Sequence, residues 1–594
     1  MKMILGPLLL WFFLSTLAAQ STVGAEPATL VLTHVTVIDA TGAAARPEMT
    51  VVVRGNRIAE IGATTKAVVP KDAQVVSAAG KFLIPGLWDM HVHPDDKPYL
   101  PLFIANGVTG IRIMWGNPEH YGWRNEIEAG KLLGPHMLIA SPIADGPRPF
   151  WPGSVSVRTE AEARQFVDRA KAAGADFVKV YTFLPREEYF AIADEAKKQN
   201  IPFEGHVPMA VTAQEASNAG QKSFEHLTGI MSATSTHSDE LNQAAQADLA
   251  GYLAGGERQF EGPHVHALRG QRLDSYDPQK AASLFALFKR NGTWQTPTLT
   301  LWHMFSSVND PGFTGDPRLK YVPVKTRESW NPADVAKTSV AENTAIGKKD
   351  FELDLRVVGA MQKAGVGILA GTDTGNPYCI SGFSLHDELG LLVRAGLAPM
   401  QALQAATINP ARFMGRENDF GTVQAGKFAD LVLLDADPLA DIDNTNKISA
   451  VIFQGKLISR TALDEMLSGV EAAASRKPVS EVLFKTIEEK NVEAAIAEFH
   501  ELKAHQPDAY DFSENELIVL GYILLHRKQI TDAIEIFKLS VENYPQSFNT
   551  YDSLGEAYMD HGDKELAIQN YQKSLQLNPG NKNGAEMLKR LTGQ

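Results

Sequence analysis

Two histidines at an i, i+2 spacing are the first residues that could do chemistry. His91 and His93 stand at the end of an apolar run. On a strand, residues two apart point to the same face, so both imidazoles could hold one metal ion. A second copy of the pattern, His264 and His266, lies in a polar stretch with no predicted strand before it. We therefore assign that second copy no ligand role.

Four further positions strengthen the metal interpretation. Lys179 lies inside a predicted strand, where a bare ammonium would be costly to bury, so it needs a partner or a modification. His206 and His226 each end a predicted strand that follows a helix, and Asp373 ends a buried strand beside glycines that let a ligand approach closely. Successive strands of a parallel barrel would bring all of these side chains to one mouth.

The central part of the chain has the alternation that such a barrel requires. Residues 86–419 alternate buried strands with amphipathic helices, as in the strand 177–181, the helix 186–199 and the strand 203–207. This α/β pattern predicts a (β/α)8 TIM barrel with insertions. A long polar insertion at about 232–290 is expected to cover or shape the substrate pocket.

The two flanks of this region contain short strands. Residues 26–85 and 420–465 are rich in β-branched runs that end at glycine turns. The segment 451–458 echoes 51–58, each with a glycine at its fifth position. We expect both flanks to pair into one small composite β-sandwich.

The C-terminal region, residues 476–594, repeats itself. Leu520-Gly521, Ala533, Phe537 and Pro545 recur 34 residues later as Leu554-Gly555, Ala567, Tyr571 and Pro579. This is the helix-turn-helix period of a tetratricopeptide repeat, and a weaker unit with Ala495, Phe499 and Pro507 precedes it. We predict an all-α repeat domain closed by a helix at 583–591. It either packs or dimerises, or it binds a protein or peptide partner.

The first 25 residues have the pattern of a secretory signal peptide. Lys2 precedes an apolar run from residue 4 to 17, which is followed by small residues at 23–25. The run is shorter than a membrane-spanning helix. We expect a secreted or periplasmic protein with no membrane span after cleavage, and an uncleaved anchor is the alternative.

The composition limits which macromolecules the protein can bind and which residue types can hold a metal. The net charge is −14 and no run is rich in Lys or Arg, which argues against nucleic acid as a partner. The 44% hydrophobic and 21% charged residues are typical of a globular protein. Because Cys379 is the single cysteine, any metal must be held by nitrogen and oxygen ligands.

From about residue 28 to 462, the sequence resembles the amidohydrolase superfamily, in the branch of imidazolonepropionase-like proteins and metal-dependent Xaa-Pro dipeptidases. The resemblance rests on segments 107–112, 205–208, 225–227, 370–373, 384–389, 405–411 and 426–434. It implies a barrel with a small sheet domain built from both flanks, in agreement with the pattern above. After Arg112 the sequence departs from the family, because Ile113-Met114-Trp115 replaces the usual Asp-Met-Gly.

The resemblance also implies roles for the candidate residues. His91, His93 and Asp373 would hold one divalent metal, and His206 and His226 the second. A carboxylated Lys179 would bridge the two ions, and Zn²⁺ is the metal that suits these nitrogen and oxygen ligands best.

The mechanism implied is attack of a metal-bridged hydroxide on an amide carbonyl, with Asp373 as the general base. Tyr181, on the same strand face as Lys179, and His386, after the last barrel strand, are candidate substrate contacts.

Three functions are open at this point. The first is an exported binuclear hydrolase that cleaves amide or peptide bonds of small substrates such as Xaa-Pro dipeptides or N-acyl amino acids. The second is a one-metal hydrolase of cyclic amides or lactones, which gives Lys179 no bridging task. The third is a non-catalytic scaffold whose repeats bind a partner. The sequence leaves a homo-oligomer open.

Overall fold

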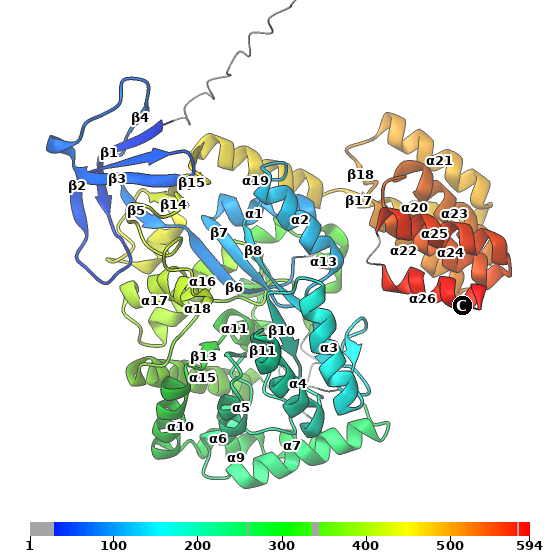
Figure 1. The fold of residues 1–594 in the computed structure, drawn as a ribbon, viewed down its shortest axis with the longest axis horizontal. Helices are drawn as coiled ribbons and strands as arrows, with labels where there is room; N and C mark the ends of the chain where they lie inside the picture. The colour runs from blue at the N-terminus through cyan, green and yellow to red at the C-terminus, as the bar shows by residue number, and fades with distance from the viewer. Residues whose placement is uncertain are drawn as a thin grey trace, which may run out of the picture.

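The structure is a computed structural model that describes residues 29–94, 96–257, 259, 262–335, 344–578 and 581–593. The predicted signal peptide, residues 1–25, lies outside the described residues. Figure 1 shows a barrel, a sheet formed beside it and a C-terminal array of helices. Within the described residues, no helix combines the length and the apolar character that a membrane crossing requires.

The barrel is the centre of the molecule, as predicted. Its parallel strands follow the order β13-β12-β11-β10-β8-β7-β6, and a short strand β9 (Val155–Ser156) pairs with β8. Their bounds are Leu87–Val92 (β6), Val108–Ile113 (β7), His136–Asp145 (β8), Phe177–Val180 (β10), Phe203–Gly205 (β11), Ser223–Glu225 (β12) and Trp294–Thr296 (β13).

The eighth barrel position is filled by residues 366–374, which form single parallel bridges instead of a regular strand. One bridge joins Gln295 to Ile368 and another joins Val92 to Thr374. The segment therefore lies between β13 and β6 and nearly closes the barrel. The predicted (β/α)8 architecture is confirmed. Its eighth strand, residues 366–374, is irregular and leads into the candidate site.

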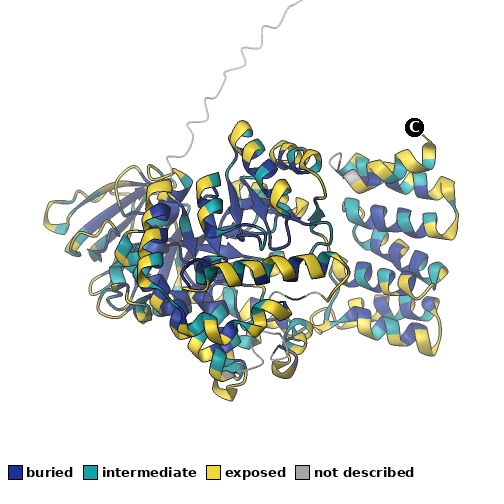
Figure 2. Ribbon diagram, turned by 90° about the horizontal axis from the view of Figure 1, so that it is seen from below, coloured by how far each residue is buried: buried dark blue, intermediate teal, exposed yellow. Residues whose placement is uncertain are grey.

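Helices cover the outside of the barrel, with their buried residues toward the strands and their exposed residues outward (Figure 2). Helix α3 (Glu160–Ala172) begins after Thr159, whose side chain accepts a hydrogen bond from the Glu162 amide, and it buries Phe166 and Val167. Helix α4 spans Arg186–Gln199, the range predicted from the sequence. The other helices that follow barrel strands are α1 (Pro101–Ala105), α2 (Pro118–Glu128), α5 (Ala213–Ala219), α10 (Pro278–Asn291), α15 (Thr344–Ala364) and α16 (Phe383–Arg394).

The predicted insertion is helical. It contains α6 (Ile230–Ala233), α7 (Ser238–Leu253), α8 (Pro263–Ala267) and α9 (Arg269–Asp274), before the barrel helix α10. Leu249 and Tyr252 of α7 pack against Tyr181 and Phe183 at the end of β10. A cavity of about 350 Å³ lies between α7, the segment that leads from α7 into α8, and Phe183 and Met209 from the loops after β10 and β11. A second helical insertion, α11 (Leu299–Ser307) to α14 (Pro332–Val335), follows β13.

Both flanks of the chain form one sheet, in agreement with the composite module predicted. Its order is β16-β15-β14-β5-β1-β2-β3, with β4 beside β1. The antiparallel pairing of β5 with β14, which aligns Ile84 with Val432, joins the two flanks. The bounds are Thr29–Val37 (β1), Arg46–Arg54 (β2), Arg57–Ala63 (β3), Gln74–Ser77 (β4), Phe82–Pro85 (β5), Leu431–Leu434 (β14), Ile448–Phe453 (β15) and Lys456–Ser459 (β16).

This module is one continuous mixed sheet by hydrogen bonding, and its apolar face encloses a single core. Leu32 and Val51 from the first flank share that core with Leu431 and Ile452 from the second. The two echoing turns also meet, because a Cβ on Gly455 would lie 1.8 Å from the carbonyl oxygen of Gly55. Only glycine fits so close a backbone approach.

The C-terminal helices form the predicted repeat array. After α19 (Arg460–Ala474) come α20 (Val479–Glu489), α21 (Val492–His505), α22 (Glu514–His526), α23 (Ile530–Asn543), α24 (Phe548–His561), α25 (Lys564–Leu577) and the closing helix α26 (Lys582–Thr592). The repeated alanine and aromatic positions of all three units belong to one core. Gly521 is needed because a Cβ there would lie 2.4 Å from the Phe537 ring.

Candidate metal centre

The six predicted ligand residues lie at the ends of barrel strands. His91 belongs to β6 and His93 directly follows it, and Lys179 belongs to β10. His206 and His226 directly follow β11 and β12. Asp373 stands at the end of the segment that replaces the eighth strand. His226 and Asp373 have φ values of +58° and +57°, a left-handed conformation that is uncommon for residues other than glycine and is often found at functional sites.

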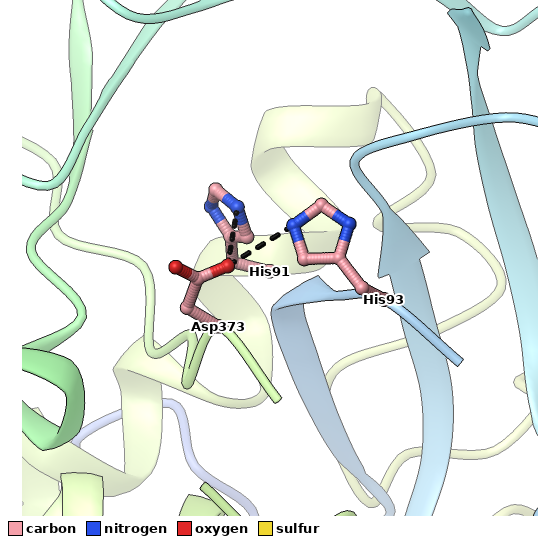
Figure 3. Close-up of side chains that lie close together, drawn as sticks. All are labelled: His91, His93 and Asp373. Carbon is pink, nitrogen blue, oxygen red and sulfur yellow. Dashed lines mark ion pairs between the residues drawn. The ribbon is translucent and has the colours of Figure 1, made fainter. Parts of the chain in front are cut away.

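Three of these residues converge closely, as Figure 3 shows. Asp373 Oδ1 lies 3.2 Å from His91 Nε2 and 3.0 Å from His93 Nε2. One ligand atom from each residue lies within 4.8 Å of the others. His91 Nε2 and Asp373 Oδ1 are buried without a hydrogen-bond partner among the described residues. Because buried polar atoms are normally satisfied, these atoms fit a divalent cation held by nitrogen and oxygen.

The charge on Asp373 agrees with this role. Burial alone would raise the pKa of its carboxyl, but the neighbouring His91, His226 and His93 hold that pKa well below its usual range. Asp373 is therefore ionised at neutral pH, which is the form that binds a metal.

The other two histidines extend the same cluster. The His226 ring centroid lies 4.5 Å from that of His91 and 4.9 Å from that of His206. Burial lowers the pKa of His226 to about 3 and that of His206 well below its usual value. Both imidazoles are neutral at physiological pH, as metal binding requires.

Lys179 is buried within β10, beside the cluster. Burial lowers the pKa of its ammonium to about 8, although Glu225 and Asp373 act in the opposite direction. An amine that loses its proton this easily is a better nucleophile toward CO₂ than an ordinary lysine. This favours the predicted carboxylation, which stays a prediction.

The sequence analysis missed the residues that orient the histidines. Glu225 Oε2 lies 2.9 Å from His91 Nδ1, and the hydroxyls of Thr182 and Thr298 lie 2.8 Å from Nδ1 of His206 and His226 respectively. Thr182 and Glu225 are close in sequence to predicted ligands, and this closeness is the one sequence feature that could have identified them. Asp89 has a similar task, because it accepts hydrogen bonds from the amides of His91 and Thr372 and so holds the two strand ends together.

A fully buried arginine, Arg112, lies inside the barrel next to the candidate ligand residues. The Arg112 guanidinium donates to Glu204 Oε2 at 2.7 Å and to both carboxylate oxygens of Glu225 at 3.0 and 2.9 Å. It also donates to Ser223, to Thr296 and to the carbonyl of Met90. Arg112 thereby joins β6, β7, β11, β12 and β13 beneath the ligands.

Tyr181 lies beside the histidine cluster, and its predicted substrate contact stays a prediction. Its ring centroid is 4.0 Å from that of His206, and Trp151 Nε1 donates a hydrogen bond of 2.8 Å to its hydroxyl. Phe150 and Phe183 belong to the same apolar cluster. The candidate ligand residues are therefore flanked by aromatic side chains on the side of β8 and β10.

His386 is not brought to the cluster. Its Nδ1 lies 2.9 Å from the Thr445 hydroxyl and its Nε2 lies 3.0 Å from the carbonyl oxygen of Asn106. Both ring nitrogens are therefore used in packing α16 against its neighbours, and a substrate contact by His386 finds no support. The second H-x-H also lies apart, because His264 and His266 are exposed on α8 and His264 pairs with Asp248.

Comparison with known proteins gives two family matches. Residues 337–458 match the amidohydrolase family, and residues 548–581 match the tetratricopeptide repeat. An adenine deaminase from Rubrobacter xylanophilus is 24% identical over 454 residues, which are 74% of this chain and 59% of that protein. The chain thus spans less than two thirds of the length of this relative. An imidazolonepropionase from Shouchella clausii is 36% identical over 103 residues, which are 17% of this chain and 23% of that protein.

Solved structures show the same fold. A bottromycin amidohydrolase aligns with a TM-score of 0.58 and 25% identity, covering 76% of this chain and 91% of that one. A Xaa-Pro dipeptidase with bound methionine in its active site aligns with a TM-score of 0.50 and 19% identity, covering 73% of this chain and all of that one. The chain therefore carries an amidohydrolase family domain with imidazolonepropionase- and prolidase-like neighbours, and a tetratricopeptide repeat at its C-terminus.

Proposed function

We propose that this protein is a metal-dependent hydrolase that cleaves amide or peptide C–N bonds of small substrates, such as Xaa-Pro dipeptides or N-acyl amino acids. The observation that carries the proposal is the convergence of His91, His93 and Asp373, with buried ligand atoms that lack hydrogen-bond partners among the described residues. These three would hold one ion. His206 and His226 would hold a second, and a carboxylated Lys179 would bridge the two. Zinc suits these nitrogen and oxygen ligands.

The chemistry of such a site follows from known metal hydrolases. A bound divalent ion supplies Lewis acidity, which lowers the pKa of water and polarises a carbonyl group. Asp373 acts as the general base. Its low pKa keeps it ionised, so it can take a proton from the attacking water and deliver it to the nitrogen of the leaving amine.

The aromatic side chains that flank the candidate ligand residues support small substrates with an apolar part. Tyr181 stands beside His206, and its hydroxyl is held by Trp151. Substrate affinity would come from contact with such side chains, with a few polar groups fixing the orientation. The similarity to an amidohydrolase, an adenine deaminase and an imidazolonepropionase favours hydrolysis at carbon–nitrogen bonds.

A one-metal hydrolase of cyclic amides or lactones is the second candidate. The observation that favours it is that His91, His93 and Asp373 form one three-residue group whose ligand atoms lie within 4.8 Å of one another. The number of ions bound per chain separates the two candidates.

Two further proposals rest on sequence patterns. The leader at residues 1–25 supports export to the periplasm or the medium. The repeat array supports a protein or peptide partner, because stacked helix pairs present extended surfaces for binding.

The test combines elemental analysis with turnover. We expect about two Zn²⁺ ions per chain and cleavage within a panel of Xaa-Pro dipeptides and N-acyl amino acids. Lys179→Ala should lose one ion and most activity, whereas His266→Ala, which removes an exposed histidine of the unused H-x-H, should lose neither. Full metal content and full activity in Lys179→Ala would refute the bridged site. An absence of both metal and turnover in the unmodified chain would refute the proposed function.

A further inference from the structure

The candidate ligand histidines differ in the group that hydrogen-bonds to Nδ1, the ring nitrogen that faces away from the metal position. His91 Nδ1 faces a carboxylate, that of Glu225, and both side chains are fully buried. His206 and His226 face neutral hydroxyl groups, those of Thr182 and Thr298. The two proposed metal positions therefore have different surroundings, although both contain imidazole ligands.

The direction of two of these hydrogen bonds follows from the chemistry of the groups. An ionised carboxylate can only accept, so His91 donates from Nδ1 and its Nε2 lone pair faces Asp373. The Thr298 hydroxyl donates to the carbonyl oxygen of Pro297 at 2.8 Å, so its oxygen accepts from Nδ1 of His226. Both imidazoles thus present Nε2 as the ligand atom, but only His91 donates to a charged acceptor.

Glu225 is itself fixed in place. Both of its carboxylate oxygens accept hydrogen bonds from Arg112, and Oε1 also accepts from Ser223 at 2.5 Å. Arg112 is fully buried and is anchored to the Met90 carbonyl and to Glu204. A carboxylate held this rigidly keeps His91 in one tautomer and one orientation. It also makes the imidazole a stronger donor to a metal than a hydroxyl partner does.

We infer that the two metal positions differ in affinity. The position of His91, His93 and Asp373 fills first and binds tightly, and the position of His206 and His226 fills second and exchanges more readily. This inference rests on the proposed function, because it needs a chain that holds two ions. Partners behind metal ligands typically change affinity by about 10- to 100-fold, so we expect the two dissociation constants to differ by at least about tenfold.

In this arrangement Glu225 and Arg112 are positioning residues. Glu225 acts on the metal through His91, and Arg112 acts through Glu225. Neither is placed to touch the substrate, since Glu225 and Arg112 have no exposed side-chain surface.

The experiment is a titration of the metal-free full chain with Zn²⁺ by calorimetry, and with Co²⁺ by visible absorption. We expect two successive phases of one ion each. His93→Ala should abolish the tight phase and His206→Ala the weak one, while His266→Ala leaves both. Glu225→Gln, which keeps the shape but removes the charge, should weaken the tight phase by 10-fold or more. Thr298→Val should weaken only the second phase.

The outcomes distinguish this inference from the proposed function. Circular dichroism and thermal unfolding identify variants that fail to fold. If Glu225→Gln or Thr298→Val fails to fold, the titrations of the wild type, His93→Ala and His206→Ala still test the inference. Two ions that bind with equal affinity, or a tight phase lost in His206→Ala, would overturn the inference and leave the proposed hydrolase intact. A single ion per chain would overturn the inference in favour of the one-metal candidate. No bound ion would overturn both.

Discussion

Replacing Gly371 by alanine should disable the site through a steric clash. Gly371 lies two residues before Asp373, in the segment that fills the eighth barrel position. A Cβ there would lie 2.5 Å from Cγ2 of Thr296 and 2.9 Å from both the Cβ and the backbone nitrogen of His91, where ordinary contact begins near 3.4 Å. The Thr296 methyl must therefore retreat by about 0.9 Å and the His91 backbone by about 0.5 Å.

The expected magnitude follows from this displacement. Overpacking of a buried site typically costs about 1–3 kcal/mol of unfolding free energy. A misplacement approaching 1 Å in a reacting group costs about 100-fold in rate. We expect Gly371→Ala to fold with a lower free energy of unfolding, to bind metal more weakly and to lose about 100-fold in kcat/KM.

The assay compares metal content, kcat/KM and thermal unfolding with those of a matched variant, Gly122→Ala. Gly122 lies in α2, and a Cβ there meets no atom within 4 Å. Gly122→Ala should raise the free energy of unfolding by about 0.5–1 kcal/mol and leave activity unchanged. Adding Thr296→Ser to Gly371→Ala removes the nearest methyl and should restore part of the loss. Wild-type metal content and kcat/KM in Gly371→Ala would refute the reasoning.

The remaining predictions concern other buried groups. The Tyr571 hydroxyl is buried without a hydrogen-bond partner among the described residues, so Tyr571→Phe should stabilise the repeat array by about 1 kcal/mol in thermal unfolding. Tyr522→Phe should destabilise the repeat array, because the Tyr522 hydroxyl lies 2.8 Å from Glu556. An equal loss of thermal stability in Tyr571→Phe and Tyr522→Phe would contradict this account. Burial raises the pKa of Glu388 to about 8, so the native state holds the proton above the unfolded pKa near 4.5. Unfolding free energy should therefore fall by up to about 1.4 kcal/mol per pH unit between pH 4.5 and 8, and Glu388→Gln should flatten that slope in denaturant titrations. Trp151→Phe, which removes the bond to Tyr181, should raise KM more than it lowers kcat; an unchanged KM would exclude Tyr181 from substrate binding.

The positions of the candidate ligand side chains at the barrel mouth could be predicted from sequence because each depends on a short local pattern. His206 and His226 follow apolar strands, and parallel strands deliver their ends to one mouth whatever the details of packing. The repeat array was predictable for the same reason, since Ala533 and Phe537 recur at a fixed period and pack locally.

What could not be predicted depends on contacts between distant segments. The support of His91 by Glu225 joins residues 134 positions apart, and no local pattern encodes it. His386 was misjudged because the sequence places it near the last barrel strand without showing which side of α16 it occupies. The echo between the two flanks predicts that they pair, but it does not show that β5 and β14 are the strands that join them.

The pairing of β5 with β14 also determines the order in which the chain can complete its structure during synthesis. Strand β5 lies between β1 and β14, so one of its edges stays unpaired until the ribosome has made residues beyond Leu434. Until then the apolar residues of β1 and β2 lack the partners contributed by β14 and β15. Exposed strand edges of this kind invite pairing with other chains. The nascent N-terminal strands therefore need protection while the entire barrel is translated. A chain truncated before residue 431 should aggregate, whereas one truncated after residue 475 retains every strand of the sheet.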